Sequence, residues 1–282
     1  MNLSEIFKMR DFDISKTKLV RHKDNKTHDL KIIYEAGKVM DYQSVQSKDV
    51  FLNCDYIVSF LGIESSKAKL IGIYKITGRT KVQFINAPKD FPYPDFYNTP
   101  EDYYYEMEEL NLLDDLKERL IIDWGKAAIK WDQWLKDNDK EIIEILPKGY
   151  FEKFPGFLDF TLTFNELKKI ITNPDSNREW HRMLGSVAGV YLILDEFEGL
   201  QYIGSATGER GIIGRWEQYA KTFHGDNELL KKLLSKNPER YKSFRFCILQ
   251  TLPRTLARKE VVAHEMKYKE KLGTRAFGLN GN

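Results

Sequence analysis

The sequence predicts an α+β protein with two domains: a β-rich, mixed α+β N-terminal domain and a C-terminal α/β sandwich. Its 282 residues exceed the usual length of a single domain. Strand-like runs separated by Gly- and Ser-containing turns occupy much of the first hundred residues. Beyond residue 187, two apolar runs joined by a tight turn are followed by two helical segments, a strand and a final helix. That order is typical of helices packed on a three-stranded antiparallel sheet.

The composition is that of a globular protein, with 42% apolar and 30% charged residues. The first residues carry scattered charges and no apolar core, so we expect no secretory signal. The longest apolar runs, such as 190–194, have the length of a strand, so we expect a cytoplasmic protein with no membrane partner. Cys54 and Cys247 are too few for a disulfide framework or a cysteine-based metal site, and we expect buried thiols.

Charge is distributed unevenly along the chain. Residues 181–282 contain 17 Lys and Arg against 11 Asp and Glu, a formal charge of +6. Residues 1–180 contain 27 against 31, a formal charge of −4. The C-terminal part is therefore where we expect a polyanion to bind.

In the N-terminal half, four short runs have the composition of strands and predict a small, mostly antiparallel sheet or barrel. A Pro-rich aromatic segment, 91–110, is expected to form a loop that leads into a helix. Residues 114–136 are expected to be helical, because Trp124, Trp131 and Trp134 then share one face. We interpret these tryptophans as packing anchors, with base stacking as the alternative. The four strand-like runs are 30–34, 56–61, 69–76 and 81–85.

The boundary between the domains is expected at residues 173–177. A helix should begin after Thr163, because Glu166 three residues later completes a capping box, and Pro174 should end that helix. A second short helix is expected to lead into Gly185. The domains that follow from this boundary are residues 1–175 and 181–282.

The C-terminal domain is expected to begin with a β-hairpin, formed by residues 187–194 and 200–205 around the turn sequence DEFEG. A Gly-rich loop, SATGERGIIG, then leads into a helix from about Ile212. Next we expect a helix from about Asn227 that is capped by Asp226, a strand at 244–249, and a final helix at 256–272.

Two charged residues of this domain stand out. Glu265 shares a helical face with Val261 and Leu272, and a carboxylate in an apolar stripe is costly unless it is paired or binds a metal. A salt bridge and a metal site are both open at this point. Arg215 lies near a helix start after the Gly-rich loop, where N–H groups and a guanidinium together can hold a phosphate. An ordinary surface arginine is the alternative.

Six motifs or residues of this domain follow one another in a defined order. Gly189-Val190-Tyr191 lies in the first strand of the hairpin and Tyr202-Ile203-Gly204 in the second; Arg215, His224, Glu265 and Asn280 follow. This set resembles the signature of the GIY-YIG nuclease superfamily over residues 186–282, about a third of the chain. Valine in place of isoleucine in the first motif is a one-methylene change at a core-facing position. The strings GRWEQYAKT, HGDN and KEKLGTRAFGLN are most similar to restriction-type and phage-defence members.

The resemblance implies a catalytic role for Glu265 and the two motif tyrosines. Glu265 would hold one divalent cation, Mg²⁺ or Mn²⁺, because a hard cation suits a carboxylate and waters. Tyr191 would act as, or assist, the general base, which requires its pKa to be lowered by a nearby cation or arginine. Tyr202 would orient the attacking water or the phosphate.

The remaining signature residues are implied to support the reaction. Arg215 would stabilise the charge of the transition state. His224 would relay or accept a proton near Tyr191, with the capping of a backbone group as its alternative. Asn280 would hold the geometry of the site through side-chain hydrogen bonds. The other histidines are expected to be structural or exposed: His22, His28, His181 and His264.

The N-terminal half carries a more distant resemblance. Its stretch YIVSFLGIESSKAKLIGIYKI is similar to the strands of PUA-like and EVE-like domains, small barrels that in some relatives hold a flipped base in an aromatic pocket. By that resemblance this half would select the DNA that the other half cuts. Tyr56, Phe60, Tyr74 or the tryptophan face would then stack on the base. A generic sheet that supports helices is the alternative.

Together these features predict a metal-dependent DNA endonuclease that hydrolyses phosphodiester bonds, acting in restriction or defence against foreign DNA. One site of this kind cuts one strand, so a double-strand break would need a homodimer or two successive cuts. A repair or structure-selective nuclease is one alternative. The other is an inactive nucleic-acid-binding protein, against which the intact signature argues.

Overall fold

The structure, a computed structural model, describes residues 1–23, 27–125 and 130–281. It divides the chain into two compact units, Met1–Leu146 and Pro147–Asn282. The division therefore lies well before the hinge expected at 173–177. The segment between the two positions includes helix α4 (Phe164–Thr172), which contributes Phe164, Leu167 and Ile170 to the core of the C-terminal unit. A fragment that began near residue 177 would lack this helix.

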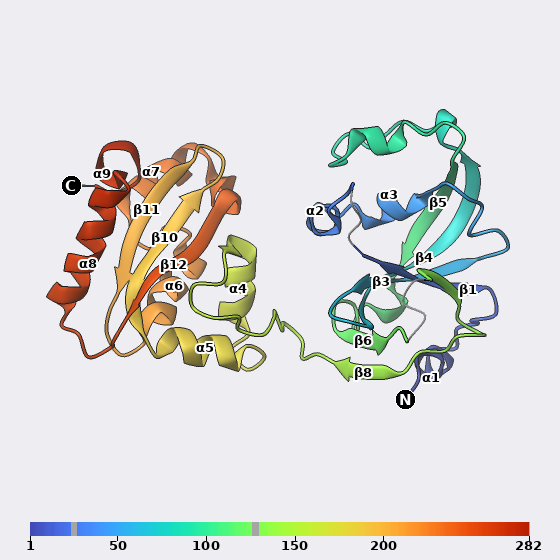
Figure 1. The fold of residues 1–282 in the computed structure, drawn as a ribbon, viewed down its shortest axis with the longest axis horizontal. Helices are drawn as coiled ribbons and strands as arrows, with labels where there is room; N and C mark the ends of the chain where they lie inside the picture. Colours follow the sequence, from blue (N-terminus) through green and yellow to red (C-terminus); the bar gives the residue numbers. More distant parts are fainter. Residues whose placement is uncertain (24–26, 126–129, 282) are drawn as a thin grey trace. The chain divides into compact units, whose positions relative to one another are not determined.

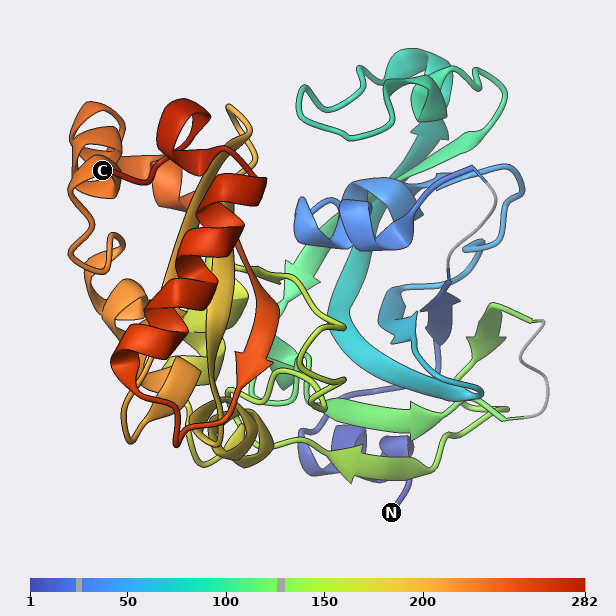
Figure 2. The ribbon, with the colours of Figure 1, turned by 60° about the vertical axis from the view of Figure 1, so that its left-hand side comes forward.

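The N-terminal unit is built on an eight-stranded sheet (Figure 1). Its strands are β1 (Thr17–His22), β2 (Val45–Gln46), β3 (Tyr56–Gly62), β4 (Lys67–Lys81), β5 (Tyr103–Leu110), β6 (Leu120–Asp123), β7 (Asp132–Trp134) and β8 (Ile142–Ile145). The main path runs β2-β5-β4-β3-β1-β7, with β6 paired to β4 and β8 to β6. Only the β1–β3 pair among these is parallel, which confirms a mostly antiparallel sheet. Figure 2 shows the long strand β4 curving through the sheet, with a bulge between Ile76 and Gly78.

Short helices and 3₁₀ turns connect these strands. They are α1 (Leu3–Met9), α2 (Leu30–Glu35), α3 (Val39–Ser44), η1 (Val82–Phe84), η2 (Pro94–Tyr97) and η3 (Asn111–Leu113). Helices α2 and α3 lie in the crossover between the parallel strands β1 and β3, a connection that parallel pairing requires.

Two of the four expected strands of this unit are confirmed, at 56–61 and 69–76, and two are wrong. The run 30–34 forms helix α2, because the Asp29 side chain accepts the backbone N–H groups of Lys31 and Ile32 and so caps a helix. The run 81–85 is a 3₁₀ turn that follows the end of β4. The helix expected after the loop at 91–110 is also wrong: its last residues form strand β5, which pairs along most of its length with β4.

The helix expected at 114–136 is absent from the described part of that segment, and residues 126–129 lie outside the described residues. Residues 120–123 and 132–134 are strands instead. Trp124 is fully buried against Phe60, with ring centroids 6.3 Å apart. Trp131 and Trp134 pack in a different cluster, around Phe51. The packing interpretation of the tryptophans is confirmed, but the helical spacing between them was incidental because pairing with other strands decides this segment.

The C-terminal unit contains a four-stranded antiparallel sheet with the order β11-β10-β12-β9. The expected three strands are β10 (Ala188–Asp195), β11 (Leu200–Ala206) and β12 (Phe244–Leu252), and the two-residue strand β9 (Leu162–Thr163) adds an edge. The helices and the 3₁₀ turn are α4, α5 (Arg178–Gly185), α6 (Gly211–Thr222), α7 (Glu228–Lys236), η4 (Pro238–Ser243), α8 (Arg258–Lys271) and α9 (Thr274–Phe277). The expected order from the hairpin to the final long helix is confirmed, as is the capping box of Thr163 and Glu166. Helix α7 is capped by Asn227 and not by Asp226.

Helices cover both faces of this sheet (Figure 1). On one face, α4, α5 and α6 enclose the main core, which includes Tyr191 and Trp216. On the other face, α8 packs through Val261 against Ala188 and Leu252. The sheet is thus the middle layer of an α/β sandwich, as the sequence predicts.

The structure bears on two expectations from the composition, the state of the cysteines and the absence of a membrane span. Both cysteines are free: Cys54 is buried as expected, and Cys247 is half-buried. Within the described ranges, no helix combines the length and the apolar character that a membrane crossing requires.

A buried ion pair holds the end of β10. Asp195 is fully buried and Arg240 is 6% exposed, and Arg240 Nη2 lies 2.6 Å from Asp195 Oδ2. Ser243 also donates its hydroxyl to the carboxylate, at 2.5 Å. Burial raises the pKa of Asp195, but the hydrogen bonds from Arg240 and Ser243 outweigh it and hold the pKa below its usual value.

We expect Arg240→Met to lower the free energy of unfolding of the C-terminal unit by about 3–5 kcal/mol, because Asp195 is left buried and unpaired. Arg178→Met is the matched control: Arg178 pairs with Asp175, but both side chains are largely exposed, and such pairs contribute about 0–1 kcal/mol. Urea denaturation followed by circular dichroism measures both changes. Equal losses in the two variants would show that the buried pair does not hold β10.

Candidate active site

An open cavity of about 970 Å³ lies in the C-terminal unit, formed by residues of β11, α6 and α8 and the loop before α6. Three of the six expected site residues line it: Tyr202, Arg215 and Glu265. Their neighbours in the wall include Ser205, Arg210, Glu217, Gln218, Lys221 and Arg258. Residues far apart in the sequence therefore meet at one surface of this unit.

The two tripeptide motifs lie side by side in the hairpin. Tyr191 of β10 is directly opposite Gly204 of β11. A Cβ at Gly204 would collide with the Tyr191 ring, so a residue without a side chain is needed for the phenol to lie across β11. A Cβ at Gly189 would lie 2.5 Å from the carbonyl oxygen of Gln250 on β12, so the first motif glycine is needed for the close approach of the strands.

Arg215 is held by two tyrosine hydroxyls. Its Nε lies 3.2 Å from the Tyr191 hydroxyl and its Nη2 lies 3.3 Å from the Tyr219 hydroxyl. The two hydroxyls are 3.1 Å apart, and the guanidinium also lies over the Tyr219 ring at 4.9 Å. Nη1 donates to the side chain of Gln218. The guanidinium thus has a fixed orientation at the cavity wall, with capacity left for an anion.

Tyr191 is fully buried behind Arg215 and does not line the cavity. Burial raises the pKa of its phenol well above the usual value, and Tyr202 raises it further, whereas Arg215 and Tyr219 lower it only in part. The phenol is therefore protonated at neutral pH. The lowered pKa that a general base requires is not present in this arrangement of protein groups.

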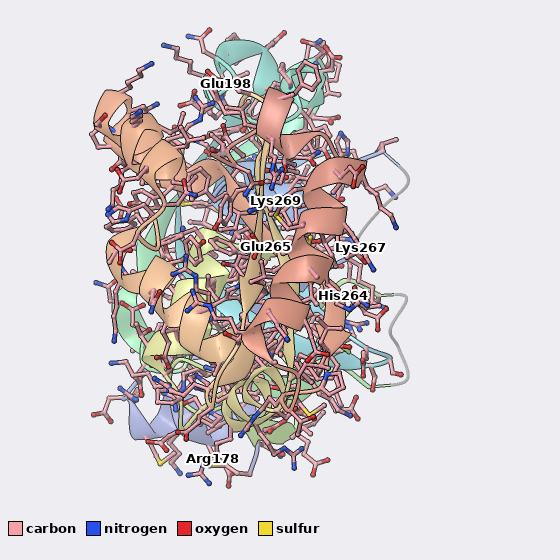
Figure 3. All side chains as sticks on the ribbon, turned by 90° about the vertical axis from the view of Figure 1, so that its left-hand side faces the viewer. Arg178, Glu198, His264, Glu265, Lys267 and Lys269 are labelled. Atoms are coloured by element: carbon pink, nitrogen blue, oxygen red, sulfur yellow. The ribbon has the colours of Figure 1, made fainter. Side chains whose placement is uncertain are left out.

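Glu265 lies on the inner side of α8. Its Oε2 accepts the hydroxyl of Ser205 on β11, and its Oε1 lies 2.5 Å from Nζ of Lys269, one helical turn further on. Both charged side chains are 14% exposed. Figure 3 shows Glu265 and Lys269 on one edge of α8, and His264 and Lys267 on the opposite edge. The salt bridge that the sequence leaves open as an alternative is therefore formed with Lys269, and Glu265 also lines the cavity.

The chemistry of Glu265 fits a hard divalent cation that keeps most of its waters. Within the described residues, no group of three or more His, Cys, Asp or Glu side chains could hold a metal ion. Mg²⁺ does not need such a cage, because it is commonly bound by one or two carboxylates, waters and substrate phosphates. One carboxylate at the wall of an open cavity matches that mode of binding.

The cavity wall is also rich in cationic groups. Arg210 pairs with Glu217, but in the described part of the chain Arg215, Lys221 and Arg258 form no ion pair with a carboxylate. Unpaired cations beside a cavity attract and position a polyanion. The wall also contains the carboxylates Glu209, Glu217 and Glu265, so what favours a polyanion here is the set of unpaired cations and not a large net charge.

His224 and Asn280 lie outside the cavity wall. His224 Nδ1 accepts the backbone N–H of Asp226 at 3.0 Å, which is the capping role named as its alternative. Asn280 is 3% exposed and bonds the backbone of Ile203 twice: its Oδ1 accepts from the N–H at 2.9 Å and its Nδ2 donates to the carbonyl at 2.7 Å. Asn280 therefore holds β11 in place and does not face a substrate.

Three residues of the site were not expected from the sequence: Ser205, Tyr219 and Lys269. Tyr219 lies four residues after Arg215 and Lys269 four residues after Glu265, so helical spacing alone could have found both. Ser205 follows the second motif directly, but its contact with α8 depends on how that helix packs. Neither spacing nor composition carries that information.

Comparison with known proteins finds only partial structural similarity. No protein-family model matches the chain, and no curated protein matches it significantly. Two solved structures match part of it. The catalytic domain of the homing endonuclease I-TevI is 19% identical, covering 34% of this chain and 98% of that one, with a TM-score of 0.28. A mutant of the catalytic domain of the intron endonuclease I-TevI is 20% identical, covering 33% and 92%, with the same TM-score. These partial alignments do not assign the chain to a family.

We expect Lys269→Met to bind Mn²⁺ about two- to fivefold more tightly than the wild type, because the ammonium no longer competes for Glu265 and ion pairs of this kind are worth up to about 1 kcal/mol. Lys267→Met is the matched control, since Lys267 is exposed on the other edge of the same helix. Electron paramagnetic resonance of free Mn²⁺ measures the affinity without DNA. An equal gain in both variants would indicate a general charge effect and not competition at Glu265.

Proposed function

We propose that this protein is a metal-dependent endonuclease that hydrolyses phosphodiester bonds of DNA at the cavity of the C-terminal unit. The observation that carries the proposal is that Glu265 and Arg215 line one open cavity. A carboxylate suited to a cation and a guanidinium suited to a phosphate thus face the same space. Hydrolysis of a phosphodiester needs both, because negative charge builds on the phosphoryl and leaving oxygens in the transition state.

Arg215 binds and stabilises the phosphate in this proposal. Its orientation is set before substrate arrives, because Tyr191, Tyr219 and Gln218 hold three of its nitrogens. Preorganised charge of this kind acts without reorganisation during the reaction. Lys221 and Arg258 contact neighbouring phosphates and hold the strand across the cavity.

Tyr191 acts in this proposal through Arg215 and not as a free base. Its protonated phenol accepts from Arg215 Nε and shares a hydrogen bond with Tyr219, which together keep the guanidinium and the proton network in place. Tyr202 lies in the cavity wall and orients the attacking water or the phosphate. Glu265 holds a Mg²⁺ or Mn²⁺ ion, which supplies Lewis-acid stabilisation of the reacting phosphate when bound.

Restriction of foreign DNA is the setting that we propose, on the basis of the strings that resemble restriction-type and phage-defence members. A repair or structure-selective nuclease would use the same cavity, so the DNA that is cut distinguishes the two. Preferential cleavage of plasmids according to their base modification supports restriction, and preferential cleavage of branched DNA supports repair. One cavity cuts one strand at a time, so linear products at early times would indicate a homodimer.

We expect the wild type to nick supercoiled plasmid in Mg²⁺ or Mn²⁺ and Glu265→Gln to show no detectable cleavage. Glutamine keeps the size of the side chain but loses the charge that holds the cation. Glu270→Gln, at an exposed carboxylate of the same helix, should cut at the wild-type rate. DNA binding, measured by fluorescence anisotropy, should be retained by both variants. Cleavage by Glu265→Gln, or by the wild type in excess chelator, would refute the metal-dependent site.

We expect Tyr191→Phe and Arg215→Ala each to lower the cleavage rate by about a hundredfold or more, the usual loss for a positioned or charge-stabilising group. Tyr191→Phe removes one hydroxyl and leaves the ring packed over Gly204. Tyr241→Phe and Arg254→Ala are the matched controls, because neither residue lines the cavity. Single-turnover rates measure all four variants. A wild-type rate for Tyr191→Phe would leave Tyr191 as a core residue without a part in the reaction.

A further inference from the structure

The cavity that contains Glu265 and Arg215 crosses one edge of the C-terminal sheet. Its wall includes residues of α6, which covers one face of the sheet, and of α8, which packs on the other face. A cavity bounded by helices on opposite faces passes over the edge between them, and β11 is the edge strand on that side (Figure 1). The main chain of β11 therefore borders the site together with the side chains already described.

The outer edge of β11 is the side that faces away from β10. Asn280 binds both the N–H and the carbonyl oxygen of Ile203 at this edge, and Leu279 donates its N–H to the carbonyl oxygen of Gln201. Successive residues of a strand direct their main-chain groups to alternate sides. Ser205, two residues after Ile203, therefore presents its N–H and its carbonyl oxygen at the same edge.

The C-terminal segment contacts this edge at Gln201 and Ile203 but leaves it open at Ser205. Within the described part of the chain, neither main-chain group of Ser205 has a hydrogen-bond partner beyond the strand. Ser205 lines the cavity, whereas Gln201 and Ile203 do not. An opening of one residue is too short for pairing with a further β-strand. It fits a small polar group instead.

The N–H of Ser205 restricts the chemistry of that group. An N–H is a donor, so it binds an oxygen acceptor and not a metal ion. The unpaired cations of the described wall, Arg215, Lys221 and Arg258, favour an acceptor that is negatively charged. A phosphate oxygen meets both requirements, and its bond to an N–H is charge-assisted. Water can donate to the carbonyl oxygen of Ser205 beside it.

The carboxylates of the wall do not exclude an anion from this position. Glu217 and Glu265 are each paired with a cation, and Glu209 is exposed. Glu265 accepts the hydroxyl of Ser205, whose side chain stands out from the sheet toward α8, whereas the N–H lies in the plane of the sheet. The side chain and the N–H of Ser205 thus point in different directions, one to the carboxylate and the other to open space.

The start of α6 is the other source of main-chain donors that the sequence suggests. Its first two N–H groups are already engaged: Gly211 donates to the carbonyl oxygen of Gly208 at 3.2 Å, and Ile212 to that of Val187 at 3.1 Å. The helix start therefore has fewer free donors than the Gly-rich loop leads one to expect. The edge of β11 adds a donor that the sequence does not reveal.

We propose that the main-chain N–H of Ser205 donates a hydrogen bond to a non-bridging oxygen of the phosphate bound at this site. That oxygen gains negative charge when water attacks the phosphorus, so the hydrogen bond strengthens in the transition state. The part of the N–H in catalysis rests on the proposed endonuclease function. Binding of a phosphate by the N–H does not require cleavage.

Nuclear magnetic resonance observes this N–H directly in the full-length protein. Labelling with ¹⁵N-serine gives the amide signals of the serines, and Ser205→Ala assigns that of Ser205 by its absence. A single-stranded oligonucleotide is added in chelator, so that no DNA is cut. We expect the Ser205 proton signal to move downfield until the protein is saturated, because a hydrogen bond to an anionic oxygen forms. Gln201, at the same edge but outside the cavity, is the control after labelling with ¹⁵N-glutamine and should show no such shift.

Replacement of one amide by an ester tests the role of the N–H in the reaction. Suppression of a stop codon places lactic acid at position 205, and Ser205→Ala is its reference because the two differ only in the N–H. We expect the ester to cleave DNA about a hundredfold more slowly than Ser205→Ala in single turnover, the usual loss for one transition-state donor. Lactic acid at position 201, compared with Gln201→Ala, is the matched control. It weakens the same strand pair outside the cavity and should cleave at the rate of its reference.

Each outcome bears on the proposal. A downfield shift of Ser205 but not of Gln201, with slower cleavage by the ester at 205 alone, supports it. An unshifted Ser205 signal, no binding of the oligonucleotide, or an ester at 205 as fast as Ser205→Ala overturns it. Equal losses in both esters also overturn it, because weaker strand pairing then explains them. Absence of Glu265-dependent cleavage refutes the nuclease instead, and the shift of Ser205 still reports phosphate binding, so the two failures are distinguishable.

Discussion

The candidate active site depends on the packing of one tyrosine over one glycine. Because Gly204 has no side chain, the Tyr191 ring crosses β11 and its hydroxyl reaches Arg215 and Tyr219. A shift of β11 by one residue would turn these side chains to the opposite face. Asn280 opposes such a shift: β11 is an edge strand, and Asn280 binds both free backbone groups of Ile203. The last residues of the chain thus act on the site through strand register.

The two ionisable groups at the centre of the site, Tyr191 and Glu265, differ in how far they are buried. Tyr191 is sealed from solvent, and burial keeps its phenol protonated even though a guanidinium lies beside it. Glu265 is half-buried at the cavity, where its carboxylate contacts Lys269 and Ser205. A neutral phenol can orient Arg215 without adding charge, whereas an accessible carboxylate can exchange its lysine for a stronger cation. The difference in burial therefore separates the orienting group from the cation-binding one.

How far the sequence predicts the structure differs between the halves. The sequence predicts the hairpin around Tyr191 and Tyr202 well, and also the helices that carry Arg215 and Glu265. In these elements the local sequence pattern and the tertiary packing favour the same structure. In the other half, 114–136 shows helical spacing of tryptophans, yet pairing to distant strands decides the outcome. Residues 30–34 show the reverse case: their composition is that of a strand, but the Asp29 side chain caps them as a helix. The order of the motifs also does not reveal the turn in which Nδ1 of His224 accepts the N–H of Asp226, and a role of His224 in the reaction stays a prediction.

The charge that the candidate active site offers to a ligand depends on which of its groups are paired. The C-terminal cavity carries Arg215, Lys221 and Arg258 without carboxylate partners in the described residues, as a phosphate backbone requires. Two of its carboxylates are occupied by cations, Glu217 by Arg210 and Glu265 by Lys269, so the unpaired charges of the wall among the described residues are mainly positive. The basic excess of residues 181–282 therefore appears at this cavity as unpaired cations, which a phosphate backbone can bind.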